Sequence, residues 1–235
     1  DESIYSSGTH VDCGGEWLKQ RTLEEGGSYF VDDVNKNYRL YPVLTDHDGD
    51  GILDAYCGSS DGKIYYYKGL GMTGLDGRLR FAEPQLVTRT DGNLVMTEMF
   101  SSPAILDVDG DGVSDLLVGG ADGKINWYRG SGTLQYEPMG LLIDGEFSGQ
   151  ALPAAGDVNG DGVPDLLVGS NRGILLLFFG EKNGAGVTSS HGNMRALSRQ
   201  CRDAVEGDWY APSLADYNGD GKQDLLVGTF DGYVA

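Results

Sequence analysis

The stretch LDVDGDGVSDLLVG, residues 106–119, decides the fold of this chain, because three close copies of it occur elsewhere in the sequence. The copies are TDHDGDGILDAYCG at residues 45–58, GDVNGDGVPDLLVG at 156–169 and ADYNGDGKQDLLVG at 215–228. All four align without gaps and share the pattern D-x-[DN]-G-D-G-x-x-D, followed by an apolar triplet and a glycine. Repetition of this kind is typical of a protein built from similar structural units.

Each copy places side-chain oxygens at positions 1, 3, 5 and 9 of a curled loop, and the backbone carbonyl of position 7 can add another oxygen. Calcium prefers six to eight oxygen ligands, and the glycines at positions 4 and 6 let the backbone curl tightly. We therefore expect the chain to bind about four Ca²⁺ ions, one in each loop. The predicted ligands are Asp46, Asp48, Asp50, Ile52 and Asp54 in the first loop, Asp107, Asp109, Asp111, Val113 and Asp115 in the second, Asp157, Asn159, Asp161, Val163 and Asp165 in the third, and Asp216, Asn218, Asp220, Lys222 and Asp224 in the fourth.

Three other interpretations of these loops are an ordinary solvated turn, an EF-hand and a dockerin loop. A single Asp-Gly run can be an ordinary solvated turn, but four copies with one spacing argue against that interpretation. An EF-hand or a dockerin loop needs an acidic residue at position 12 and a following helix. Position 12 is instead Cys57, Val118, Val168 or Val227. Because segments such as DLLVG are short, apolar and closed by glycine, we expect the loops to lead into β-strands.

The bulk composition limits the classes of partner. Acidic residues number 36 and basic residues 17, which gives a net charge of −19 and opposes binding to phosphate backbones and anionic lipids. The longest apolar run, Ile174 to Phe179, is far shorter than the roughly 20 residues of a membrane span. Glycine contributes 38 residues, which suggests many tight turns between short strands. We expect neither a nucleic-acid partner nor membrane insertion.

The four loops and their apolar strands resemble the FG-GAP or VCBS repeat, the blade unit of integrin α-subunit propellers and of several secreted lectins and polysaccharide-acting proteins. The resemblance covers residues from about 41 to 235, and 118–121 echo the Gly-Ala part of the family name. It implies an all-β fold, a β-propeller of four-stranded antiparallel blades in which the metal loop joins the first two strands. In the second repeat these strands are expected at 102–106, 115–119, 124–129 and near 135–143.

The expected organisation is a single β-propeller-like domain spanning residues 1–235. Its repeats would cover about 41–100, 101–150, 151–210 and an incomplete 211–235. Residues 1–40 would form an N-terminal closing segment that supplies the outer strands missing from the last blade. Two outcomes stay open: a four-bladed ring closed within the chain, or a partial ring completed by another molecule, which would leave a strand edge free for a neighbouring chain.

Aromatic residues and histidines offer weaker signals. Tyr65–Tyr67 and the equivalent Trp127 and Tyr128 could stack on sugar rings, but their place on blade strands favours packing between sheets. The three histidines, His10, His47 and His191, lie near no recognisable nucleophile arrangement, and we interpret them as surface residues.

The three cysteines are too few for a disulfide scaffold. Cys57 occupies the place of a valine in the other repeats, so we expect a buried free thiol. If the N-terminal segment closes the ring beside the fourth blade, Cys13 and Cys201 would pair as a disulfide, which favours an oxidising compartment.

The function expected from these features is that of a non-catalytic, secreted calcium-binding module for adhesion, glycan binding or self-assembly. Its partner would be a protein or glycan ligand, or copies of itself in a homo-oligomer or filament. The alternative is a lyase-like enzyme acting on polysaccharides, or an accessory domain of one. All four acidic clusters follow one template, whereas catalysis needs a constellation that breaks the repeat, so no catalytic residues are predicted.

Overall fold

The computed structural model of the chain describes residues 12–13, 16–17, 41–72, 79–144, 149–180, 194–196 and 209–229. Every regular element in this part of the chain is a β-strand. A helix of the length and apolarity needed to cross a membrane does not occur there. The expected all-β class is therefore confirmed.

The second repeat forms a complete antiparallel sheet. Its strands are β10 (Ser102–Leu106), β11 (Asp115–Gly119), β12 (Ile125–Arg129) and β13 (Gln135–Ile143), each paired with the next. All four predicted strands are present, and the third begins one residue later than expected. β9 (Thr88–Arg89) adds a parallel strand beside β13.

The other repeats follow the same plan, and we refer to the sheets of the four repeats as blades 1 to 4. Blade 1 contains β3 (Tyr41–Thr45), β4 (Asp54–Gly58), β5 (Ile64–Tyr67) and β8 (Gln85–Leu86). Blade 3 contains β14 (Ala151–Gly156), β15 (Asp165–Ser170), β16 (Leu175–Phe178) and β17 (Met194–Ala196). The described part of blade 4 is the pair β18 (Ala211–Ala215) and β19 (Asp224–Gly228).

A further small sheet lies beside blade 1. The hairpin β6 (Gly69–Met72) and β7 (Leu79–Phe81) is extended by β1 (Asp12–Cys13) and β2 (Glu16–Trp17). The described pieces of the N-terminal segment therefore pair with a hairpin that lies in the chain between β5 and β8 of blade 1, and neither is a neighbour of β18 or β19. The rest of residues 1–40 lies outside the described residues, so the closing role expected of the segment stays a prediction.

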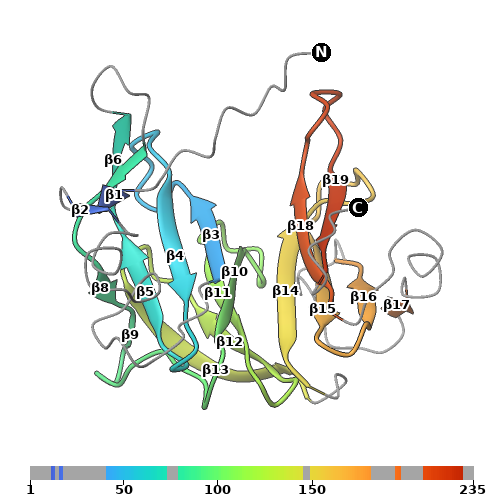
Figure 1. Cartoon of the computed structure of the whole chain (residues 1–235), viewed down its shortest axis with the longest axis horizontal. Coiled ribbons are helices and arrows are strands. Elements are labelled where there is room, and N and C mark those ends of the chain that lie inside the picture. Colours follow the sequence, from blue (N-terminus) through green and yellow to red (C-terminus); the bar gives the residue numbers. More distant parts are fainter. Residues whose placement is uncertain are drawn as a thin grey trace.

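The blades succeed one another along a curved path from β3 to β19 (Figure 1). Their first strands, β3, β10, β14 and β18, are the inner strands of this arrangement. Together they line a cavity of about 320 Å³, to which each contributes a proline: Pro42, Pro103, Pro153 and Pro212.

The hydrophobic core lies between successive blades. Tyr56 and Ile64 of blade 1 pack with Leu116 and Val118 of blade 2, and all four side chains are fully buried. A second cluster joins blades 2 and 3, and a third joins blades 3 and 4. Because apolar side chains cover both faces of the middle blades, each of those blades depends on its neighbours for burial.

A glycine at the end of the second strand makes each inter-blade contact possible. A Cβ atom placed on Gly58, Gly119 or Gly169 would lie only 2.0–2.3 Å from a backbone oxygen of the next blade, and 2.7–2.9 Å from the Cδ of that blade's inner proline. We call this the inter-blade glycine contact. It occurs between blades 1 and 2, 2 and 3, and 3 and 4.

The equivalent contact at the far side of blade 4 is absent from the described residues. A Cβ atom on Gly228 would meet only Ala211 of its own blade, at 3.7 Å or more. Pro42, the inner proline of blade 1, is exposed, whereas Pro103 and Pro153 are buried. Leu44, two residues further along β3, is 47% exposed. The described residues therefore form an open series of blades, and a closed four-bladed ring is not established.

The structure also tests the aromatic and cysteine predictions. Tyr66, Tyr67 and Tyr128 are buried, as core packing predicts. Tyr65 and Trp127 are partly buried and pack against hydrophobic clusters. Cys57 is a buried free thiol, as expected. For the predicted disulfide, Cys201 lies outside the described residues, so the pairing stays a prediction.

Candidate functional site: four acidic loops

The four acidic loops share one backbone conformation, which is organised by the aspartate at position 1. In the second loop, Asp107 accepts hydrogen bonds from the backbone amides of Gly110, Asp111 and Gly112. The equivalent Asp46, Asp157 and Asp216 accept the same three bonds, at 2.7–3.1 Å. The glycines at positions 4 and 6 have φ between 74° and 86° in every loop, a conformation that favours glycine.

In the first three loops, the aspartate at position 9 connects the loop to the rest of its blade. Asp115 is fully buried and accepts hydrogen bonds from the amides of Val108 (3.0 Å) and Gly130 (2.7 Å) and from Nε1 of Trp127 (3.0 Å). Asp54 and Asp165 are equally buried and bond the equivalent two amides. Burial raises the pKa of Asp115 and of Asp165, and these hydrogen bonds oppose the rise.

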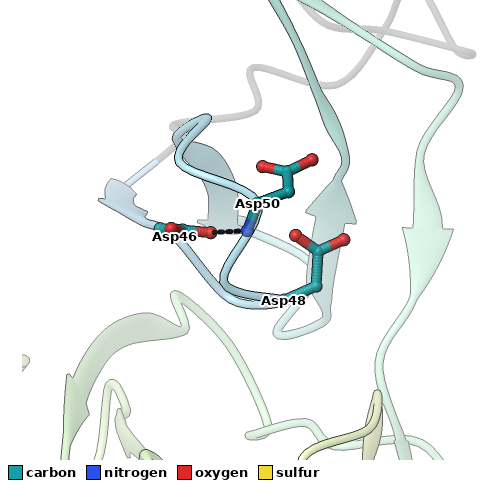
Figure 2. Close-up of side chains that lie close together, drawn as sticks. All are labelled: Asp46, Asp48 and Asp50. Carbon is teal, nitrogen blue, oxygen red and sulfur yellow. Dashed lines mark hydrogen bonds between the residues drawn. The ribbon is translucent and has the colours of Figure 1, made fainter.

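Carboxylates converge within the first two loops. Side-chain oxygens of Asp46, Asp48 and Asp50 lie within 4.8 Å of one another, on the curl that Figure 2 shows. The second loop brings Asp107, Asp109 and Asp115 equally close. The predicted ligands at positions 1, 3 and 5 of the first loop, and at 1, 3 and 9 of the second, thus gather around one point in each loop.

The third and fourth loops have asparagine at position 3. The side-chain oxygen of Asn159 accepts a hydrogen bond from the backbone amide of Asp161 at 2.9 Å. Its Nδ2 donates a hydrogen bond to the Asp161 carboxylate at 3.1 Å. Asn218 makes the same two bonds to Asp220. At position 7 the backbone amide donates to the position-5 carboxylate in all four loops, while the predicted role of the position-7 carbonyls of Ile52, Val113, Val163 and Lys222 stays a prediction.

The donor set fits a hard divalent cation. Each of the two described clusters consists of aspartate carboxylates, and neither sulfur nor an imidazole nitrogen joins them. Hydrogen bonds from backbone amides hold the position-1 carboxylate in place before any ion binds. This lowers the entropic cost of ordering the site.

Two basic side chains lie against these carboxylates, and the sequence analysis missed both. Nζ of Lys68 is 2.6 Å from Asp48 and 2.6 Å from Asp50. Nε and Nη2 of Arg129 are 2.8 Å from Asp109 and Asp111 respectively. Hydrogen bonds to Asp48 and Asp50 raise the pKa of Lys68. The available signal was their spacing, because each basic residue follows position 3 of its loop by twenty residues.

His47, at position 2 of the first loop, is not the surface residue that the sequence analysis predicted. Its ring is half-buried and meets Tyr56 and Tyr66 edge-on, with ring centroids 5.7 and 5.5 Å apart. Its Nδ1 is 3.0 Å from the hydroxyl of Tyr56, which in turn is 2.8 Å from the hydroxyl of Tyr136 in blade 2. Burial lowers the pKa of His47. The surface prediction was wrong because the ring packs against Tyr56 and Tyr66 of the two following strands, β4 and β5. His10 and His191 lie outside the described residues.

Comparisons with known proteins bear on the repeat. Among solved structures, a crystal structure of Raptor from Chaetomium thermophilum is similar at 16% sequence identity, with a TM-score of 0.47; the match covers 88% of this chain and 16% of that one. A search of curated proteins gave no significant match. The sequence model of the FG-GAP-like repeat matches residues 107–168 and 157–227. These two matches together span residues 107–227, more than half of the sequence, so the chain belongs to the FG-GAP-like repeat family.

Proposed function

We propose that this chain is a non-catalytic, calcium-binding β-propeller module that acts outside the cell in adhesion, glycan binding or self-assembly. One observation carries the proposal: four acidic loops adopt the same amide-lined curl, and each leads into the second strand of its blade. The ions would bind between the loop carboxylates and fix the connection between the first two strands of every blade. Calcium would therefore stabilise the folded blades.

Exposure of the loops supports an extracellular setting. Asp46, Asp48 and Asp50 are all exposed, and attraction between charges weakens in contact with water. Exposed sites of this kind suit binding in the 10⁻⁴ to 10⁻³ M range that is typical of extracellular calcium modules. The net charge of −19 keeps the module away from nucleic acids and anionic lipids, and leaves proteins, glycans or further copies as partners.

The open series of blades supports self-assembly. We define the leading face as Pro42 and Leu44 of β3, and the trailing face as Leu226 and Gly228 of β19. Leu226 is partly exposed, whereas its counterparts Leu117 and Leu167 are buried. The two faces are the two halves of an inter-blade glycine contact, so the trailing face of one copy suits the leading face of another. Such a head-to-tail interface produces either a closed ring or a filament.

Calorimetric titration of metal-free protein with CaCl₂ tests the metal site. We expect saturable binding of about four ions, and we expect EDTA to lower the melting temperature, because an ion bound only by the folded state stabilises it. At one hundred times the dissociation constant, each site contributes about 2.7 kcal/mol. Asp111→Ala should remove about one ion from the stoichiometry.

Asp122→Asn is the matched control, because Asp122 accepts the amide of Lys124 in a turn outside the loops. Its stoichiometry should equal that of the wild type. Absence of heat at millimolar Ca²⁺, with melting curves that EDTA leaves unchanged, would refute the proposed metal site. Release of unsaturated products from a polysaccharide would contradict the non-catalytic part of the proposal and favour the lyase-like alternative.

A further inference from the structure

The residue at position 3 of a loop and the residue twenty positions later differ together among the repeats. In blades 1 and 2 position 3 is Asp48 or Asp109, and the later residue is Lys68 or Arg129. In blade 3 the pair is Asn159 and Phe179, and Phe179 packs on the hydrophobic cluster between blades 3 and 4. An acidic position 3 thus accompanies a cation, and a neutral position 3 accompanies an apolar side chain.

This pairing equalises the charge of the three sites. The first and second loops carry four carboxylates and one neighbouring cation, which leaves a formal charge of −3. Among the described residues no cation pairs with the three carboxylates of the third loop, so the formal charge of that loop is also −3. The extra carboxylates of the first two loops are those of Asp48 and Asp109, and these are among the groups that Lys68 and Arg129 contact.

The geometry of the contacts places the cations between neighbouring carboxylates. Lys68 and Arg129 each bridge positions 3 and 5 of one loop, which would otherwise repel each other. Both side chains reach the loop from the end of the third strand. The adjoining glycines, Gly69 and Gly130, donate their amides to the buried position-9 carboxylates. The strand end that anchors the loop therefore also carries its counter-charge.

We propose that Lys68 and Arg129 are resident counter-cations that replace part of the metal's charge in the first two loops and set the metal affinity of those loops. The inference rests on the proposed calcium sites. Without metal, Lys68 and Arg129 hold positions 3 and 5 of the first two loops together, and in the third loop Asn159 makes the corresponding contact by donating to Asp161. When metal binds, the cation shares or gives up its two carboxylates, so removing the cation strengthens metal binding.

The second loop offers a site-specific probe. The indole of Trp127 bonds to Asp115, a predicted ligand of that loop, so Tb³⁺ bound there is sensitised by excitation of Trp127. In a Tb³⁺ titration, Arg129→Met should lower the dissociation constant about tenfold, the effect of one unscreened charge at close range. Lys124→Met is the matched control, because Lys124 pairs with Asp144 outside the loops and its loss should leave the affinity unchanged.

A second variant and a second readout guard against a change in folding. Asp109→Asn combined with Arg129→Phe copies the third loop and should restore an affinity close to that of the wild type. In EDTA, hydrogen exchange of the amides at 110–112 should be faster in Arg129→Met than in the wild type, while exchange at 160–162 should be the same in both proteins.

The outcomes separate this inference from the function on which it rests. If the wild type binds no Tb³⁺ and no Ca²⁺, the proposed function fails and the inference fails with it. If the wild type binds but Arg129→Met binds equally or more weakly, only the inference is overturned. Tighter binding by Arg129→Met, together with faster exchange in EDTA, supports it.

Discussion

Asp115 combines two roles that are usually separate. Its carboxylate belongs to a predicted metal site, yet it is fully buried and accepts two backbone amides and one indole N–H. The amide of Gly130 lies at the end of β12, so Asp115 attaches the loop to the third strand of the same blade. A hydrogen-bonded carboxylate of this kind is costly to remove, because each donor would be left without a partner. Position 9 is therefore important for the blade even without an ion.

Cys57 provides a prediction at the scale of one residue. Burial raises the pKa of its thiol to about 12, from an ordinary value of 9.0. The thiol should resist iodoacetamide at pH 9 in the folded protein and react once the protein is unfolded in urea. Peptide mapping by mass spectrometry separates Cys57 from Cys13 and Cys201. Rapid alkylation of Cys57 in native conditions would contradict its buried position.

The raised pKa of Cys57 also fixes the sign of a pH effect. The folded state keeps its proton more firmly than the unfolded chain does. The resulting stabilisation is complete below pH 9 and is lost as the pH rises from 9 towards about 12. Cys57→Ala should therefore show a smaller loss of unfolding free energy over this alkaline range than the wild type does.

Strands and loops differ in how far the sequence predicted them. The DLLVG segments and the strands of blade 2 were predicted within one residue, because their pattern is local: an apolar run bounded by an acidic loop and a glycine. The β6–β7 hairpin and β17 were not predicted. These three strands are short, and they lie in the longer segments between the repeated motifs, where no repeated pattern marks them.

The candidate site shows the same division. The loop ligands were visible as a local spacing, whereas Lys68 and Arg129 reach the loops only because the third strand returns alongside the second. The partners of His47 were hidden for a similar reason, since Tyr136 lies on another blade. Contacts between elements need the register of the strands, which the sequence pattern alone did not supply.

The inter-blade glycine contact gives a prediction for packing between blades. Gly169→Ala would place a methyl group 2.0 Å from the backbone oxygen of Tyr210, so blades 3 and 4 must separate. We expect a loss of about 3 kcal/mol in unfolding free energy, as in other overpacked interiors. Gly228→Ala, where the same atom meets nothing closer than 3.7 Å, should change stability by less than about 0.5 kcal/mol.

Urea denaturation of dilute protein, with calcium held constant, measures both variants. The pair forms an internal control, because both glycines occupy the equivalent position in the second strand of a blade. Equal damage from the two substitutions would contradict the open series of blades and would favour a ring closed within the chain.

At the scale of the whole molecule, the proposed self-assembly gives a prediction, because the leading and trailing faces meet no other blade among the described residues. Light scattering across a concentration series should detect species of two or more times 25.1 kDa. Leu44→Glu places a charge on the leading face and should reduce assembly, and Gly228→Ala should do the same from the trailing face. Met139→Glu, at an equally exposed position on the outer strand of blade 2, is the control and should assemble normally. A single 25.1 kDa species of the wild type at every concentration would exclude self-assembly through these faces.

The repeated glycine contact also affects how such a chain can change in evolution. Gly58, Gly119 and Gly169 each contact the next blade at an equivalent backbone oxygen and at the equivalent proline ring. A duplicated gene segment encoding one blade would therefore meet both of its new neighbours through contacts that already exist. Loss of one internal segment would leave the remaining blades equally compatible. Length in this architecture can vary in whole blades, whereas a partial blade would expose an unpaired strand.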